Sequence, residues 1–321
     1  MVSLQDLKKQ SKQNLEKLVS KTKENTFNKQ KDDRMWYPQR GEDGNGFAVI
    51  RFLPIPMVDA ENENALAWAK IYSHSFKNES TGKWYIENSL STFNEKDPCA
   101  EANQELWNKG EEGQAQARAQ KRNLSYYSNV YVVKDPLHPE NEGKVFIYRY
   151  GKKIYDKILE LLSPDETYGE EPVDPFNFWT GRDFKIKIKT IKSGNTSFPN
   201  YDSSEWAPVA PISDKTGRAL NDDEIEAVWA SEYSLLELLD RKNFKTYDEL
   251  KKKLDEVLGR ASSDSDRVVE EMRKSAEKPK EQPKKSSVVE DDDVPFDVDN
   301  KSSDVDDTDE LINQWINDDD D

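Results

Sequence analysis

Ser125-Tyr-Tyr-Ser-Asn-Val-Tyr-Val-Val133 and Lys144-Val-Phe-Ile-Tyr-Arg-Tyr150 have the clearest β-strand pattern in the sequence. Both stretches are rich in aromatic and β-branched residues, which favour extended backbone on a sheet. A loop containing proline and glycine separates them, as is typical between neighbouring strands. Gly151 ends the second stretch, and the apolar spacing of residues 152–162 then predicts a helix. The centre of the chain is therefore predicted to be a β-rich core with a helix attached.

The pattern continues on both sides of this centre. Further strands are predicted at residues 47–53, 67–76, 83–90 and 183–189. The last of these, Asp183-Phe-Lys-Ile-Lys-Ile-Lys189, alternates polar and apolar residues, as a half-exposed strand does. Residues 222–239 and 246–258 are predicted to be helices, and residues 101–122 a helix or a mobile insertion. We therefore predict an α+β fold.

The composition limits the class of protein. The chain has 321 residues, enough for one large domain with appendages or for two small domains. Its single cysteine, Cys99, excludes an internal disulfide framework and is typical of a reducing compartment. No apolar run approaches the roughly 18–20 residues that span a bilayer, and the N-terminus lacks the apolar stretch of a signal peptide. We expect a soluble, intracellular protein.

Charge is concentrated at the two ends of the chain. Residues 288–321 hold fifteen acidic residues and one basic residue, whereas residues 1–287, with 49 acidic and 46 basic residues, are close to neutral. Residues 1–40 are predicted to be a basic arm, with an amphipathic helix at residues 3–24. Residues 260–321 are predicted to be a disordered acidic tail, because their polar composition cannot offset the entropy of ordering. Such a tethered polyanion is able to compete with another polyanion for basic stripes on the body.

The last residues regain a short apolar pattern. Leu311, Ile312, Trp315 and Ile316 would share one face of a helix that begins near Asp307. This face is typical of a partner-binding motif on a tether, but it also fits an ordinary C-terminal helix docked on the core. We favour the partner-binding interpretation, because 52 residues, most of them polar, separate the motif from the last predicted core helix.

Basic residues are interleaved with aromatic residues in three blocks. These are Arg118, Lys121, Arg122, Tyr126, Tyr127 and Tyr131; Lys144, Phe146, Tyr148, Arg149, Tyr150, Lys152, Lys153 and Tyr155; and Arg182, Lys185, Lys187, Lys189 and Lys192, followed by Phe198 and Tyr201. Cations neutralise phosphates, and exposed rings stack on unpaired bases with roughly 1–3 kcal/mol per base, so the pattern fits single-stranded nucleic acid. It also fits two-faced strands with rings in the core and lysines in water, and the residues alone leave both interpretations open.

The sequence offers few residues for a metal site and no familiar catalytic motif. His74, His138 and Cys99 are too few to supply the four ligands of a structural zinc site. The sequence lacks a phosphate-binding G-x-x-x-x-G-K-[ST] loop, a G-x-S-x-G elbow and an H-E-x-x-H motif. Its runs of Asp and Glu fall in the predicted tail, where carboxylates are not held in place for nuclease chemistry. We predict that the protein is not an enzyme and has no cofactor.

Several longer stretches resemble a known family. Val132-Val-Lys-Asp-Pro136, Pro139-Glu-Asn-Glu-Gly-Lys-Val-Phe146 and Tyr148-Arg-Tyr-Gly-Lys-Lys-Ile154 closely resemble the single-stranded DNA-binding proteins of T4-type bacteriophages. The resemblance implies an OB-fold β-barrel core at residues 41–259 with a positively charged cleft. It also implies that the N-terminal arm mediates cooperative self-association and that the acidic tail recruits replication and recombination proteins.

The resemblance and the basic blocks together assign roles to single residues. The resemblance implies DNA contacts at Lys121, Arg122, Tyr126, Tyr127, Tyr148, Phe198 and Tyr201. The basic blocks add Arg118, Arg149, Lys152 and Lys153 to the predicted contacts. In the N-terminal arm, Lys8, Lys9, Ser11 and Lys12 keep a diluted form of the family's self-association motif.

One departure from the family concerns a metal. The family type has a zinc ion held by one histidine and three cysteines. His74 and Cys99 match two of these ligands, while Ser89 and Ala102 stand at the other two positions. Two ligands cannot close a tetrahedral site, so the two matching residues are predicted to be remnants and no structural zinc is expected.

The basic-aromatic blocks predict sequence-independent binding of single-stranded DNA, and the resemblance implies that this binding is cooperative and protects the strand during phage DNA replication, recombination and repair. The expected partners are single-stranded DNA, further copies of the chain, and phage replication and recombination proteins, with no membrane. The expected location is the cytoplasm of the infected bacterial host. The alternative is an acidic protein-interaction scaffold without direct nucleic-acid binding.

Overall fold

The computed structural model describes residues 32–165, 167, 169–193 and 196–260, and the chain divides into two compact units, residues 1–36 and 37–321. In the first unit, the described residues include the short strand β1 (Met35–Trp36). The helix predicted at residues 3–24 and the acidic tail beyond residue 260 lie outside the described residues. So do the predicted self-association and partner-binding residues, Lys8, Lys9, Ser11, Lys12, Leu311, Ile312, Trp315 and Ile316.

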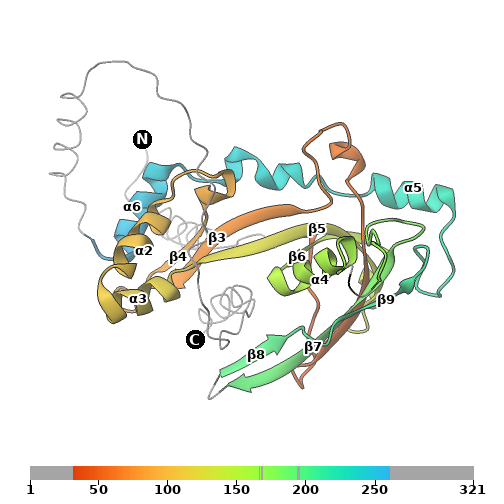
Figure 1. The fold of residues 1–321 in the computed structure, drawn as a ribbon, viewed down its shortest axis with the longest axis horizontal. Coiled ribbons are helices and arrows are strands. Elements are labelled where there is room, and N and C mark those ends of the chain that lie inside the picture. Colours follow the sequence, from red (N-terminus) through yellow and green to blue (C-terminus); the bar gives the residue numbers. More distant parts are fainter. Residues whose placement is uncertain (1–31, 166, 168, 194–195, 261–321) are drawn as a thin grey trace, which may run out of the picture. The chain divides into compact units, whose positions relative to one another are not determined.

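Antiparallel strands build the second unit (Figure 1). The long strand β5 (Arg122–Lys134) pairs along different parts of its length with β2 (Gly46–Phe52), β3 (Ala69–Lys77) and β6 (Val145–Tyr150). β2 also pairs with β7 (Arg182–Ser193), which in turn pairs with β8 (Thr196–Asn200) and β9 (Glu205–Val209). β4 (Trp84–Asn88) pairs with β3. The mixed α and β class is confirmed, and β8 and β9 are strands that the sequence pattern did not indicate.

The two faces of β7 show why these strands form a sheet. Phe184, Ile186 and Ile188 are buried, whereas the lysines between them are partly exposed. In the ladder, β2 places Ala48 opposite Ile186 and Ile50 opposite Phe184, so both strands direct apolar side chains into the same core. Burying each large apolar side chain stabilises the fold by about 1.5–3 kcal/mol. The predicted alternation of residues 183–189 is therefore confirmed, and β7 extends beyond it.

Phe52, at the end of β2, lies at the centre of an aromatic core. It is fully buried, and its ring centroid lies 5.4 Å from that of Tyr150 and 5.9 Å from that of Trp206. Tyr148, Phe176 and Phe184 also surround it. Edge-on and tilted ring pairs of this kind contribute about 0.5–1.5 kcal/mol each beyond their burial. Part of the aromatic content of the basic blocks is thus used for packing.

Five α-helices are described. They are α2 (Pro98–Trp107), α3 (Gly110–Ala119), α4 (Lys152–Leu162), α5 (Asp222–Ala230) and α6 (Tyr247–Val257). Short 3-10 helices are η1 (Met57–Asp59), η2 (Leu90–Phe93), η3 (Pro139–Asn141), η5 (Leu236–Leu239) and η6 (Arg241–Asn243). α4 has the predicted bounds and buries Ile154 and Ile158. Within the described residues, no helix has the length and apolar character needed to cross a bilayer.

Two helix predictions are wrong in extent. Residues 101–122 form parts of two helices and the start of β5, because the chain turns before Gly110, whose φ is +81°. The helix predicted at residues 222–239 ends at Ala230. Beyond it, Asp59 Oδ2 accepts hydrogen bonds from the backbone N–H groups of Leu235 (2.7 Å) and Leu236 (3.2 Å). These donors are satisfied by a carboxylate instead of by a continued helix.

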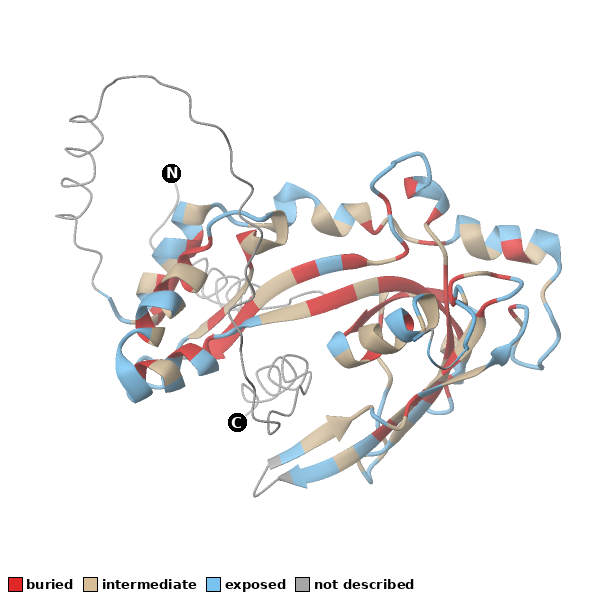
Figure 2. Cartoon of the chain, viewed as in Figure 1, coloured by how far each residue is buried: buried red, intermediate tan, exposed pale blue. Residues whose placement is uncertain are grey.

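A second apolar cluster lies where β3 and β4 meet the helices α2 and α6. Its buried members are Phe76, Tyr85, Leu90, Cys99, Ala102, Leu250, Leu254 and Val257. Figure 2 shows buried residues along β3 and β5 and again where α2 and α6 come together. The β3–β5 ladder therefore joins this cluster to the aromatic core around Phe52.

Candidate nucleic-acid interface

One face of the β3–β5 ladder carries two exposed cations. Lys70 of β3 lies opposite Tyr126 of β5, and Arg122 lies four residues before Tyr126, so these side chains share a face. Tyr72, between the cations, is half-buried, whereas Lys70 and Arg122 are exposed. The Arg122 guanidinium carbon lies 3.9 Å and Lys70 Nζ 4.9 Å from the centroid of the Tyr72 ring. We call Lys70, Tyr72 and Arg122 the Tyr72 cluster.

Tyr126 continues this face as part of a stack of rings. The Tyr155 ring of α4 lies parallel to it, with 3.8 Å between centroids and 9° between planes, and the Tyr150 ring lies 5.9 Å away. Tyr126 is only 6% exposed. Its burial, followed by the neighbouring Tyr155 and Tyr72, raises the pKa of Tyr126 to about 12. The stack is therefore continuous with the Tyr72 cluster and supports it from the interior side.

The helix α4 connects this stack to the strands β8 and β9. Lys153 Nζ donates a hydrogen bond of 3.0 Å to Asp202, next to Tyr201. The Trp206 indole N–H of β9 donates to the backbone carbonyl of Lys157 at 3.1 Å. These contacts hold the segment that contains Tyr201 against α4, next to Lys153, another predicted DNA contact that is distant in sequence.

The predicted DNA contacts differ in their exposure. Arg118, Lys121, Arg122 and Lys152 are exposed; Tyr127, Lys153, Phe198 and Tyr201 are half-buried; Tyr126, Tyr148 and Arg149 are buried. Tyr148 is 2% exposed within the Phe52 core, and the Arg149 Nε donates to the Ser125 hydroxyl at 3.0 Å. For Tyr148 the core-facing interpretation of the alternating pattern therefore describes this conformation, in which its ring has no open face for a base.

The structure brings some predicted contacts together and distributes others. Arg122 and Tyr126 belong to the face around Tyr72. Arg118 lies on α3, where its guanidinium carbon is 5.2 Å from the centroid of the Trp107 ring. Phe198 lies on β8, opposite Ile191 of β7. The eleven predicted contacts thus occupy several elements and not one continuous strip.

Sequence reasoning missed Lys70 and Tyr72. The stretch that contains them, Ala69-Lys-Ile-Tyr-Ser-His74, has a single cation and a single non-histidine ring, so it did not stand out as a basic-aromatic block. Their proximity to Arg122 follows from the register of β3 on β5, which is a tertiary property. The available signal was the period-two spacing of Lys70, Tyr72 and His74, which places all three on one face of a strand.

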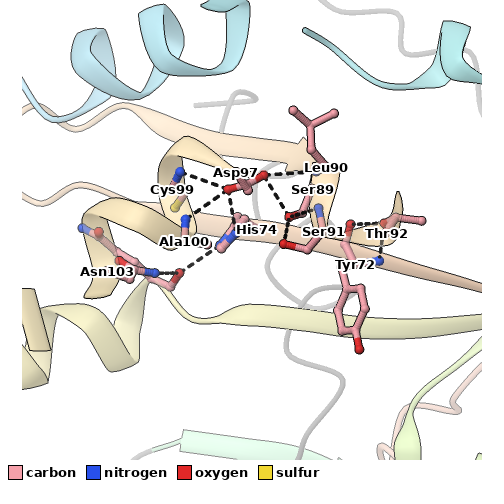
Figure 3. Close-up of polar contacts among 11 residues, drawn as sticks. Tyr72, His74, Ser89, Leu90, Ser91, Thr92, Asp97, Cys99, Ala100 and Asn103 are labelled. Carbon is pink, nitrogen blue, oxygen red and sulfur yellow. Dashed lines mark hydrogen bonds and ion pairs between the residues drawn. The ribbon is translucent and has the colours of Figure 1, made fainter. Parts of the chain in front are cut away.

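Further along β3, the same ladder leads to a buried polar network around Asp97 (Figure 3). Asp97 begins α2, and its Oδ1 accepts hydrogen bonds from the backbone N–H groups of Cys99 and Ala100, each 3.0 Å long. These bonds satisfy donors that the first helical turn leaves unpaired. Asp97 Oδ2 accepts from the Ser89 hydroxyl at 2.9 Å and from the Leu90 N–H at 3.1 Å. One carboxylate thus joins η2 to α2.

His74 of β3 completes this network. Its Nε2 lies 3.4 Å from Asp97 Oδ1, and its Nδ1 lies 3.0 Å from the backbone carbonyl oxygen of Gln120. Burial acts to raise the pKa of Asp97, but the hydrogen bond and charge of His74, together with the bonds from Ala100 and Ser89, hold it at about 2. We call His74, Ser89 and Asp97 the Asp97 cluster.

The residues in this region do not fit the zinc site of the resembling family. The Ser89 hydroxyl donates to Asp97, Ala102 has only a methyl group, and burial raises the pKa of the Cys99 thiol well above its usual range. A thiol must lose its proton to bind zinc. Across the residues that the structure describes, no group of three or more His, Cys, Asp or Glu side chains is placed to hold a metal ion. Apolar packing and the Asp97 hydrogen bonds hold this region together instead.

Comparison with known proteins points to one family. A family model described as gp32 DNA binding protein like matches residues 44–258. The single-stranded DNA-binding protein of Enterobacteria phage T2 is 36% identical over 235 residues, which cover 72% of this chain and 72% of that protein. The protein of the same name from Enterobacteria phage T4 is 36% identical over 234 residues, again 72% of each chain. That of Escherichia phage SV14 is 41% identical over 68 residues, which cover 21% of this chain and 54% of that protein.

Proposed function

We propose, since this chain belongs to the family of gp32-like DNA-binding proteins, that it binds single-stranded DNA without sequence preference. The observation that carries the proposal is the exposed cationic face of the β3–β5 ladder, which lies inside the matched residues and borders a stack of tyrosines. The proposed activity is binding and not catalysis, in line with relatives that are named as DNA-binding proteins.

The binding mechanism follows from the chemistry of this face. Exposed lysines and arginines such as Lys121 and Arg122 neutralise backbone phosphates and release condensed counterions, so affinity falls as salt rises. Half-buried rings such as Tyr127 and Tyr201 offer edges or faces to unpaired bases, which a duplex does not expose. Because the protein binds the single strand preferentially, mass action lowers the stability of the duplex.

The domain plan is part of the proposal. Residues 41–259 form the DNA-binding core, and its antiparallel ladders β6–β5–β2–β7 support an OB-fold barrel as the underlying architecture. Residues 1–40 serve as a basic arm through which copies of the chain bind the strand cooperatively, with Lys8, Lys9, Ser11 and Lys12 as contacts. Their net positive charge supports a role beside a polyanion.

The acidic tail has two proposed roles. It competes with DNA for the basic face, because tethering gives it a high local concentration there. When DNA displaces it, the apolar residues Leu311, Ile312, Trp315 and Ile316 bind replication and recombination proteins. The phage origin of the relatives supports a role in phage DNA replication, recombination and repair in the cytoplasm of an infected bacterium.

A salt titration tests the proposed function. Binding of the intact chain to a dT oligomer and to a duplex of equal length is measured by fluorescence anisotropy between low and high salt. We expect strong, salt-sensitive binding to the oligomer and weak binding to the duplex. Equal affinity at matched salt contradicts the proposal. A chain without residues 288–321 should bind the oligomer more tightly at low salt, and an unchanged affinity contradicts the competing role of the tail alone.

The scaffold alternative makes a different prediction for the same assay. If the chain binds only proteins, replacing Lys121 and Arg122 together by alanine leaves all residual nucleic-acid binding unchanged. If the basic face binds DNA, the double variant loses most of its affinity while its circular dichroism spectrum and melting temperature remain those of the original chain. Both residues are exposed, so their substitution should not unfold the chain.

A further inference from the structure

We propose that the Tyr72 cluster is a preorganised subsite for one backbone phosphate, in which Lys70 and Arg122 are the ligands and Tyr72 is the positioning residue. The inference rests on the proposed function and adds two residues, Lys70 and Tyr72, that the sequence blocks did not contain. The ligand is the phosphodiester group of a single strand and not a base.

The first argument is the geometry of the ring. Two cations lie over the Tyr72 ring, with 3.9 Å from its centroid to the Arg122 guanidinium carbon and 4.9 Å to Lys70 Nζ. Each contact of this kind contributes about 0.5–1 kcal/mol at an exposed site. The two cations therefore already contact the ring. We infer that the ring fixes the positions of these cations and does not stack on a base.

The second argument is the absence of counter-charges. Within the described residues, neither Lys70 nor Arg122 has a carboxylate within ion-pair distance. Other cations near the proposed interface do have one: Lys152 pairs with Asp156 at 2.8 Å, and Lys153 pairs with Asp202 at 3.0 Å. Two like charges held on one ring repel each other, and an anion placed between them removes that repulsion.

The third argument is the neighbourhood. Tyr126, opposite Lys70 in the ladder, stacks on Tyr155 of α4, and the positive charge of Lys70 acts to lower the pKa of Tyr155 against the larger effect of its burial. The cations therefore lie beside the stacked rings of Tyr126 and Tyr155. Long side chains lose rotamer entropy when they bind, and side chains already held by a ring lose less. A phosphate is the group on a single strand that such a fixed pair of cations recognises.

Substitution of Tyr72 tests the inference. Tyr72→Leu removes the ring but keeps an apolar side chain on β3, and Tyr72→Phe is the matched control that keeps the ring. Affinity for a dT oligomer is measured against salt concentration. We expect Tyr72→Leu to weaken binding about fivefold at low salt, with Tyr72→Phe close to the original chain. If Tyr72→Leu binds the dT oligomer as tightly as Tyr72→Phe and the original chain, the inference is wrong. The proposed function would still hold in that case, provided that the original chain binds the single strand strongly.

A double-mutant cycle makes the test independent of any loss of fold in Tyr72→Leu. Lys70→Gln and Arg122→Gln alter exposed side chains, and each should lower the slope of log affinity against log salt by about 0.7, the value for one single-strand phosphate contact. The two effects should not add, because both residues bind one phosphate. Fully additive effects, or no change in slope, contradict the shared subsite. Lys83→Gln removes an exposed cation paired with Glu256 and should leave the slope unchanged.

A neutral ligand separates phosphate binding from other contacts. On a dT oligomer with a methylphosphonate backbone, the original chain and Lys70→Gln should bind with equal affinity, because the uncharged linkage offers no anion. If Lys70→Gln still weakens binding to the neutral oligomer, the residue contacts a base or sugar and the phosphate assignment is wrong.

Discussion

The Tyr72 cluster and the Asp97 cluster lie on the same strand but differ in how their charges are satisfied. Lys70, Tyr72 and His74 alternate along one face of β3. Lys70 is exposed and lacks a carboxylate partner among the described residues, whereas His74 is 1% exposed and lies within 3.4 Å of Asp97. One strand therefore carries a cation open to an external ligand at one end and a buried histidine paired with a carboxylate inside the protein at the other.

The helices explain this difference. Where α2 and α6 pack against β3 and β4, a polar group loses its water and must find a partner in the protein. Asp97 provides that partner for His74, Ser89 and the first turn of α2. Tyr72 remains half-exposed, so cations beside it keep their water until a ligand replaces it. Burial, more than residue type, determines which polar residues stabilise the fold and which are available for binding.

Removing the Asp97 carboxylate is the strongest way to break the comparison. Asp97→Ala deletes the N-cap of α2 and leaves the Ser89 hydroxyl and several buried N–H groups without their acceptor. We expect a loss of about 3 kcal/mol in the free energy of unfolding, measured by urea denaturation. Arg122→Ala, the matched change in the Tyr72 cluster, removes one exposed cation–π contact and should alter stability by no more than about 1 kcal/mol. Equal losses for both variants would contradict the division of roles.

Much of the fold was predictable from the sequence because it depends on local pattern. The alternation at residues 183–189 and the helix at residues 152–162 need only the periodicity of apolar residues, and both are found. The end of α5 at Ala230 was not predictable, because the N–H groups beyond it are satisfied by Asp59, distant in sequence. The remaining features of the fold depend on the register between neighbouring strands, which the local pattern of residues does not show.

The candidate site was predictable only in part for the same reason. The sequence identifies Lys121 and Arg122 as cations close to aromatic residues, and the structure shows that both are exposed. The pattern of Lys144 to Tyr155 does not reveal which rings face inward, and the structure places Tyr148 in the core. Lys70 and Tyr72 become visible only when β3 is aligned with β5. The role of Asp97 was missed because it depends on hydrogen bonds from four separate residues and on the contact with His74, and not on a motif.

Acid sharpens the comparison, because it protonates the Asp97 carboxylate, which pairs with His74 at the buried end of β3. The pKa of Asp97 is about 2 in the folded chain, below its ordinary value of 3.8. The folded state therefore binds this proton less tightly than the unfolded state. The stabilisation, about 2 kcal/mol, is complete above pH 3.8 and is lost as the pH falls through 2. The stability difference between the original chain and Asp97→Ala should accordingly shrink between pH 5 and pH 2 in urea titrations, and a constant difference would contradict this.

Glu232 combines the two properties that the clusters separate. It is buried, as the Asp97 cluster is, and only 5% exposed, but neither of its carboxylate oxygens has a hydrogen-bond partner among the described residues. Burial first, and then the charge of Asp59, raise the pKa of Glu232 to about 9. The folded chain therefore keeps a proton that the unfolded chain releases above pH 4.5, and stability declines as the pH rises from 4.5 to 9.

Glu232→Gln should remove this decline. The amide stays neutral at every pH, so the variant should be more stable than the original chain at pH 8, by a few kcal/mol, and nearly equal to it at pH 4. Thermal or urea unfolding at the two pH values measures the difference. A variant less stable at pH 8 would mean that the Glu232 carboxylate is ionised and held by a partner, as Asp97 is.

The smallest expected effect separates free cations from paired cations within the proposed interface. Arg122→Ala should cost about 1 kcal/mol of single-strand binding, roughly a fivefold loss, because no carboxylate of the described residues competes for its guanidinium. Lys153→Ala should cost less, because Lys153 must first leave Asp202, to which it is bound at 3.0 Å. Asp202→Asn should then increase the contribution of Lys153 and tighten binding slightly. If Lys153→Ala weakens binding as much as Arg122→Ala in anisotropy titrations at matched salt, an internal ion pair does not reduce the contribution of a cation to DNA binding. That result would contradict the distinction between free and paired charges.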